Sequence, residues 1–160
     1  MAEQTAAVMP SAPPGVVMRV VNPLIRTVLG TPLAASLGKQ FMVLNFTGRK
    51  SGRQFSVPVT AHWLDGSLYA LMEAGWKVNF RGGAVAQVRH DGKTTAMRGE
   101  LIEDRTAIAE LFLRCASAYG PRKAQRMMGL KFRDDRMPTL EEFRTAVDEY
   151  GLAAVRFSPV

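Results

Sequence analysis

The chain has 160 residues, of which 47% are hydrophobic and 22% are charged, so it is long enough for one domain with a packed core. Its formal net charge of +7 predicts an anionic partner, and the scattered cations favour a phosphorylated small molecule or a membrane surface over a nucleic acid. A lone cysteine, Cys115, excludes an internal disulfide and a thiolate metal cluster, and without a convincing signal peptide or membrane span a cytoplasmic protein is expected.

Residues 1–13 are rich in Ala, Pro, Ser and Thr, which predicts a flexible tail before a single domain at residues 14–160. Apolar residues then recur at helical spacing over residues 17–28, with a kink expected at Asn22-Pro23. A second, short helix is predicted between Thr31 and Gly38.

The middle of the chain has the pattern of β-strands joined by tight turns. In residues 53–63 apolar and polar residues alternate, which predicts Trp63 on the apolar side and His62 on the polar side. The pairs Asp65-Gly66 and Asp91-Gly92 predict two hairpins. The predicted strands are residues 41–46, 53–63, 68–72, 84–89 and 94–102, with a last strand at 152–157.

The C-terminal third begins as a helix, with one apolar face running from Ile108 to Tyr119 and ending at Gly120-Pro121. Residues 122–138 have no clear periodicity, and a capping box at residues 139–142 then starts a helix that ends at Gly151. Consecutive hairpins with helices at both ends predict an α+β fold: a small antiparallel barrel with flanking helices.

One turn concentrates cations, hydroxyl groups and glycines between two apolar strands. Glycines allow close backbone approach, consecutive N–H groups can hold an anion, and arginine and lysine add charged donors. The alternative is a polar hairpin turn with surface cations. The residues of this turn are Thr47, Gly48, Arg49, Lys50, Ser51, Gly52 and Arg53.

The Thr-Gly-Arg-Lys-Ser-Gly run, a following strand with Pro58, an Asp-Gly hairpin, Gly75-Trp76 and Asn79-Phe80-Arg81 together resemble the deazaflavin-dependent nitroreductase family. That family belongs to the flavin and deazaflavin oxidoreductases with a split β-barrel, the FMN-binding type of fold. The match covers roughly residues 40–103. Each piece alone would be weak, but the combination is fairly specific.

The resemblance implies the deazaflavin coenzyme F-420, which carries a phosphate and an acidic polyglutamate tail. It implies that Arg49, Lys50 and Arg53 hold these anions, and that Trp76 and Asn79 lie beside the phosphate or the ring. The loop at residues 73–75 is shorter than in many family members, and its Glu73 would need compensation by Lys77 or Arg81. Tyr119 falls where the family places substrate-pocket tyrosines.

Each of these residues also has a structural interpretation. Trp76 can anchor a short helix in the core, Asn79 can cap that helix, and Tyr119 can pack at the end of an apolar helix face. Cys115 on the same face is expected to be buried and inert. His62 and His90 have no partner at metal-ligand spacing, so no metal site is expected.

The expected function is that of an oxidoreductase that transfers a hydride between reduced coenzyme F-420 and a small apolar acceptor, such as a quinone or nitroaromatic. An FMN-dependent enzyme of the same fold is the first alternative. A non-enzymatic protein that binds a fatty acid or lipid is the second, and the basic segment around Arg19 and Arg26 could then touch a membrane. A nucleic-acid-binding module is least favoured, and a homodimer stays open.

Overall fold

A computed structural model describes the chain at residues 6–10, 41–72 and 75–160. The helices expected before residue 40, together with Arg19, Arg26 and Glu73, lie outside these described residues. Within them, no helix is both long enough and apolar enough to cross a membrane.

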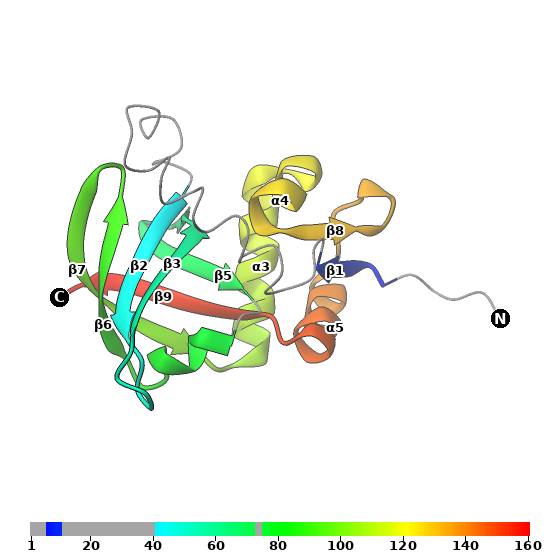
Figure 1. Cartoon of the computed structure of the whole chain (residues 1–160). Coiled ribbons are helices and arrows are strands. Elements are labelled where there is room, and N and C mark those ends of the chain that lie inside the picture. Colours follow the sequence, from blue (N-terminus) through cyan, green and yellow to red (C-terminus); the bar gives the residue numbers. More distant parts are fainter. Residues whose placement is uncertain (1–5, 11–40, 73–74) are drawn as a thin grey trace. The chain divides into compact units, whose positions relative to one another are not determined.

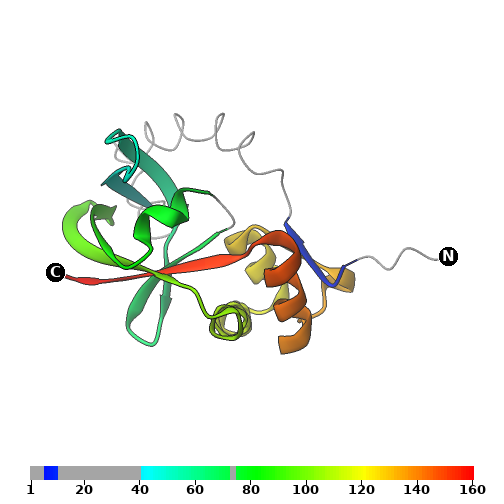
Figure 2. The same ribbon diagram turned by 90° about the horizontal axis from the view of Figure 1, so that it is seen from below.

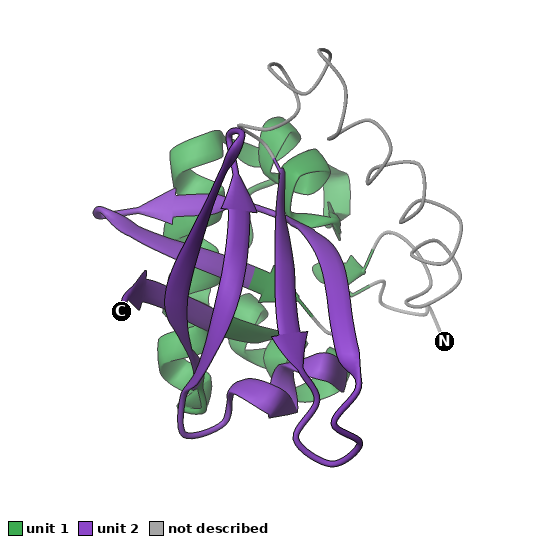
Figure 3. Ribbon diagram, turned by 60° about the vertical axis from the view of Figure 1, so that its left-hand side comes forward, with its two compact units in different colours: residues 1–13, 71–73, 102–154 green, residues 14–70, 74–101, 155–160 purple. Residues whose placement is uncertain are grey.

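The chain divides into two compact units, where the sequence predicted one domain (Figure 3). Unit 1 consists mainly of helices and unit 2 mainly of strands. Unit 1 comprises residues 1–13, 71–73 and 102–154, and unit 2 comprises residues 14–70, 74–101 and 155–160.

Most of unit 2 is a curled antiparallel sheet of seven strands in the order β3-β2-β6-β7-β9-β5-β4 (Figure 1). The α+β class and the antiparallel sheet are therefore confirmed. All six predicted strands are found, the second of them divided in two at Ala61. The strands are β2 (Phe41–Thr47), β3 (Gln54–Thr60), β4 (His62–Leu64), β5 (Ser67–Met72), β6 (Ala84–His90), β7 (Lys93–Ile102) and β9 (Ala153–Pro159).

The curl of the sheet follows from the connection between β3 and β4. These strands stand at opposite ends of the strand order, yet only Ala61 separates them in the chain. One residue spans less than 4 Å, so the two ends of the sheet must come close together there. Pro58 lies in β3, an end strand, where a missing N–H costs least.

The division at Ala61 reverses the predicted faces of the next two residues. His62 is buried with 1% of its surface exposed, whereas Trp63 is 55% exposed. Ala61 is also buried, so two consecutive side chains point inward and the alternation of β3 does not continue into β4. The prediction that Trp63 shares the apolar side of residues 55–61 is therefore wrong.

Both predicted Asp-Gly hairpins are confirmed. Asp65 and Gly66 have φ values of 52° and 78° between β4 and β5, and Asp91 and Gly92 have 51° and 77° between β6 and β7. Positive φ at both central residues gives the twist that a two-residue hairpin needs, which explains this residue pair.

The core of unit 2 contains a row of aromatic rings. Phe80 lies 5.0 Å from Phe46 and 5.6 Å from Phe157, measured between ring centroids, and all three are buried. Gly99 on β7 faces this row, and a Cβ atom there would lie 2.6 Å from Phe80 and 2.8 Å from Phe157. The absence of a side chain at Gly99 thus makes room for the rings.

Unit 1 packs its helices around a core that includes Phe112, Phe132 and Phe143. The segment without clear periodicity, residues 122–138, contains one short helix, one strand and a 3₁₀ turn. The elements are α3 (Arg105–Tyr119), α4 (Pro121–Met128), β8 (Leu130–Phe132), η2 (Arg133–Asp135), α5 (Leu140–Tyr150) and β1 (Val8–Pro10).

Strand β1 lies in the segment that was expected to be a flexible tail. It pairs antiparallel with β8, with Val8 opposite Phe132, and packs against α5 (Figure 2). The N–H of Arg133 donates to the carbonyl of Ala7 at 3.0 Å, and Val8 is only 2% exposed. Residues 8–10 therefore differ from the expectation, because one buried valine and a strand partner give them a fixed place.

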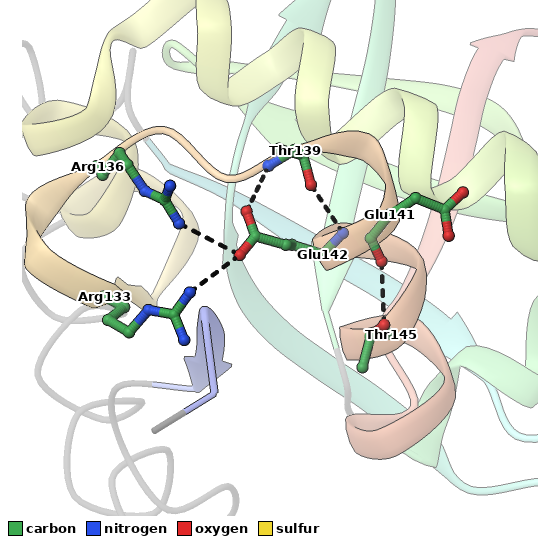
Figure 4. A network of polar contacts seen from close by, with 6 residues as sticks. All are labelled: Arg133, Arg136, Thr139, Glu141, Glu142 and Thr145. Atoms are coloured by element: carbon green, nitrogen blue, oxygen red, sulfur yellow. Dashed lines mark hydrogen bonds and ion pairs between the residues drawn. The ribbon is translucent and has the colours of Figure 1, made fainter. Parts of the chain in front are cut away.

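The predicted capping box at the start of α5 is confirmed (Figure 4). The Glu142 N–H donates to the Thr139 hydroxyl at 3.2 Å, and the Thr139 N–H donates to the Glu142 carboxylate at 2.9 Å. Arg133 and Arg136 each approach the same carboxylate at 3.3 Å. Chiefly the backbone bond from Thr139, aided by these cations, lowers the pKa of Glu142.

Candidate anion-binding site

The turn between β2 and β3, residues 47–53, is here named the basic turn. Its backbone closes on itself, because Gly48 N–H donates to Arg53 C=O at 2.8 Å and Gly52 N–H donates to Gly48 C=O at 3.0 Å. The Arg53 N–H donates to the Ser51 hydroxyl at 3.2 Å. Gly52 has a φ of 68°, which favours glycine at this position.

Gly48 allows a close approach, but to a side chain of the protein. It is buried, and a Cβ atom at this position would lie 2.6 Å from the ring of Phe55 on β3. Phe55 in turn stacks on Phe46 at 5.5 Å between ring centroids. Because Gly48 has no side chain, the basic turn can pack directly against the ring of Phe55.

The short 3₁₀ helix η1 (Gly75–Phe80) lies beside the basic turn and is joined to it by Asn79. The Arg49 N–H donates to the Asn79 side-chain oxygen at 3.0 Å, and the Asn79 amide donates to the Trp76 carbonyl at 2.9 Å. The structure thus brings together three predicted site residues that are up to 30 positions apart in sequence. Asn79 connects segments rather than only capping η1.

Two arginines bind consecutive carbonyl groups just after η1. The Arg49 guanidinium donates to Gly83 C=O at 3.3 Å, and the Arg98 guanidinium donates to Gly82 C=O at 3.1 Å. Arg98 also pairs with Glu100 at 3.0 Å. Gly83 has a φ of 93°, and any Cβ atom there would overlap the Arg98 guanidinium.

Gly82, Gly83 and Arg98 were not predicted as site residues. The only sequence signal for them is the glycine pair, which indicates a turn but not its contacts with two arginines. Arg98 lies within an ordinary strand pattern, so the sequence gives no indication of its contact with Gly82.

Part of the basic turn remains available to a ligand. Within the part of the chain that the structure describes, the N–H groups of Lys50 and Ser51 have no hydrogen-bond partner, and the side chains of Lys50 and Arg53 have no ion pair. All three residues are exposed. These are the donors and charges that a phosphate or carboxylate group would need.

The positive charge of the chain is unevenly distributed between the units. The described residues of unit 2 contain nine Lys or Arg and three Asp or Glu, whereas those of unit 1 contain nine of each. Residues 47–53 and 75–83 together hold five cations and no acid. Lys77 is half-buried and Arg81 is exposed, and both belong to this set. The field around the basic turn therefore favours anions.

Trp76 is half-buried against the aromatic rings of unit 2. Its ring centroid lies 5.8 Å from that of Phe46 and 5.9 Å from that of Phe80. These contacts hold η1 on the sheet, as the structural interpretation of Trp76 expects. Contact of Trp76 with a cofactor stays a prediction.

Tyr119 belongs to unit 1, and its contacts there are those of a packing residue. Its hydroxyl donates a hydrogen bond to Cys115, and the Lys123 ammonium lies 5.6 Å from the centre of its ring. Burial, followed by the interaction with Cys115, raises the pKa of Tyr119 to about 12. Cys115 is buried, as expected, and this burial raises the pKa of its thiol to about 11. The role of Tyr119 toward an acceptor stays a prediction.

The two histidines of unit 2 lie in different environments. Burial lowers the pKa of His62 to about 4, so its imidazole is neutral near pH 7. His90 is half-buried, and its ring centroid lies 6.1 Å from that of Trp63.

Comparison of the sequence with protein-family models gives no match, and comparison with curated proteins gives none either.

Proposed function

We propose that the protein is a deazaflavin-dependent oxidoreductase with a split β-barrel, and that the basic turn holds the anionic part of coenzyme F-420. One observation carries the proposal: the turn has an internally bonded backbone, yet it leaves two N–H groups and two cations for a ligand. The absence of acids from residues 47–53 and 75–83 adds to this support.

The chemistry of the turn fits the anions of the coenzyme. A phosphate or carboxylate oxygen accepts hydrogen bonds and is stabilised by nearby cations. The N–H groups of Lys50 and Ser51 would donate to one such group, with the Lys50 ammonium and the Arg53 guanidinium as counter-charges. The excess of six positive charges in the described part of unit 2 would attract the acidic tail before contact.

When bound, the deazaflavin ring would supply the hydride chemistry, and the protein would supply binding and orientation. The basic turn would fix the anionic end of the coenzyme. The ring would then lie against the half-buried side chain of Trp76, which provides an aromatic surface. The acceptor would be a small apolar molecule such as a quinone or a nitroaromatic.

A titration tests the proposal. Purified protein is mixed with coenzyme F-420, and binding is followed by its fluorescence over a series of salt concentrations, with FMN in a parallel series. We expect F-420 to bind more tightly than FMN, because its tail adds negative charges that the cations of unit 2 attract. We expect both to bind more weakly as the salt concentration rises, because salt screens this attraction. Tighter binding of FMN would favour the FMN-dependent alternative, and binding of neither would refute the proposal.

A pair of matched variants tests the basic turn itself. Lys50→Ala should weaken F-420 binding about tenfold or more, since a charge-assisted hydrogen bond contributes about 1.5–3 kcal/mol. Lys93→Ala removes the same charge from the exposed hairpin at the other end of β6, about 20 Å along the strand. We expect this control to bind nearly as the wild type does. Equal effects of the two substitutions would show that only net charge matters.

A further inference from the structure

Two residues that the sequence assigned to the ligand make hydrogen bonds within the protein instead. Arg49 uses its N–H for Asn79 and its guanidinium for Gly83 C=O. Asn79 uses its oxygen for Arg49 and its amide for Trp76 C=O. A ligand contact from the Arg49 N–H or from the Asn79 side-chain oxygen would have to compete with the bond between them.

These bonds also determine where the available donors of the turn lie. Arg49 directly precedes Lys50 and Ser51, whose N–H groups are unpartnered in the described part of the chain. The N–H groups of Gly48 and Arg49 are fixed before Lys50, and the N–H of Gly52 is fixed after Ser51, which leaves little freedom to the two residues between them. Donors fixed before binding lose less entropy when the anion arrives.

We propose that Arg49 and Asn79 are positioning residues, and that Lys50, Ser51 and Arg53 supply the contacts with the anion. This proposal rests on the proposed function, because it assigns separate roles to residues of the same site. It separates the residues of the basic turn by role: Asn79 and Arg49 fix its conformation, and the following residues bind.

The two roles predict different salt dependences of binding. A cation that contacts the anion contributes to the fall of affinity with salt, whereas a neutral positioning residue does not. In the F-420 titration, Asn79→Ala should weaken binding about tenfold at every salt concentration and leave the slope of log Kd against log salt as in the wild type. Lys50→Ala should weaken binding and also flatten the slope. A flattened slope for Asn79→Ala, or an unchanged Kd, would overturn the proposal.

A second measurement needs no ligand. Hydrogen exchange of the free protein, read at the Arg49 amide, should be slow in the wild type and in Lys50→Ala, and fast in Asn79→Ala. Rapid exchange of this amide in the wild type would refute the positioning role. Asn79→Ser, with a short hydroxyl, replaces Asn79→Ala if the latter fails to fold.

The two failures can be told apart. If the wild type does not bind F-420, the proposed function fails, and the same salt series is then run with inorganic pyrophosphate as the probe. Parallel slopes for wild type and Asn79→Ala with pyrophosphate, at a weaker affinity for the variant, would support the positioning role independently of the coenzyme. Identical binding of pyrophosphate by the two proteins would contradict it.

Discussion

His62 should make unit 2 sensitive to acid. The folded protein holds this imidazole neutral, with a pKa lowered from 6.5 to about 4 because it is buried. The unfolded chain takes up a proton at the ordinary pKa of 6.5. Below that pH the unfolded state therefore binds more protons than the folded state, and the free energy of unfolding falls.

The size of the effect follows from the same two pKa values. Since one pKa unit corresponds to about 1.4 kcal/mol, the difference at His62 amounts to about 3 kcal/mol. The contribution of His62 is complete above pH 6.5, declines as the pH falls from 6.5 to 4, and changes no further below pH 4. A loss of this size is a large share of the stability of a small domain.

Urea unfolding at several pH values between 7.5 and 4 measures this loss. Both tryptophans of the chain, Trp63 and Trp76, lie in unit 2, so their fluorescence reports the unfolding of that unit. The wild type should lose about 3 kcal/mol between pH 7 and 4, and His62→Gln should lose much less. His90→Gln is the control that should keep the decline of the wild type. An equally steep decline in His62→Gln would refute the assignment to His62.

Two further substitutions test the packing and the helix capping. Gly99→Ala should lower the free energy of unfolding of unit 2, measured by urea unfolding, by about 1–3 kcal/mol, because the new Cβ atom would lie 2.6 Å from Phe80. A free energy equal to that of the wild type would show that the rings can move aside. Thr139→Ala should lower the stability of unit 1 by about 1 kcal/mol, because the capping bond is lost. Circular dichroism should show this as a lower melting temperature. Thr145→Ala, at an exposed position of the same helix, is the comparison that leaves the capping box intact. No difference between the two variants would contradict the capping role.

Local signals predicted much of this fold. The Asp-Gly pairs specify their turns through positive φ, the capping box specifies the start of α5, and the alternation in residues 53–60 gives β3. Each of these signals depends on residues only a few positions apart. The strands and helices of the described chain could therefore be found where such signals exist.

The contacts between distant segments could not be predicted in the same way. Strand β1 has only three residues, and its partner β8 lies more than 100 positions later in the chain. The reversal at His62 depends on β4 pairing with β5 rather than continuing β3. The sequence indicated that residues 47–53 could hold an anion, but not that the Arg49 N–H would be taken by Asn79. Such contacts join residues that are far apart in the sequence, so no local pattern indicates them.

The position of β9 has a consequence for the order in which the protein can be assembled. Strand β9 follows the other six strands of its sheet in the chain, yet it lies between β7 and β5, so until β9 emerges from the ribosome the sheet exists only as two separate pieces. The facing edges of β7 and β5 have no partner during that time and can pair with other chains. A chain that ends before Ala153 would keep these edges open permanently. Loss of the last strand should therefore cause aggregation rather than a mild loss of stability.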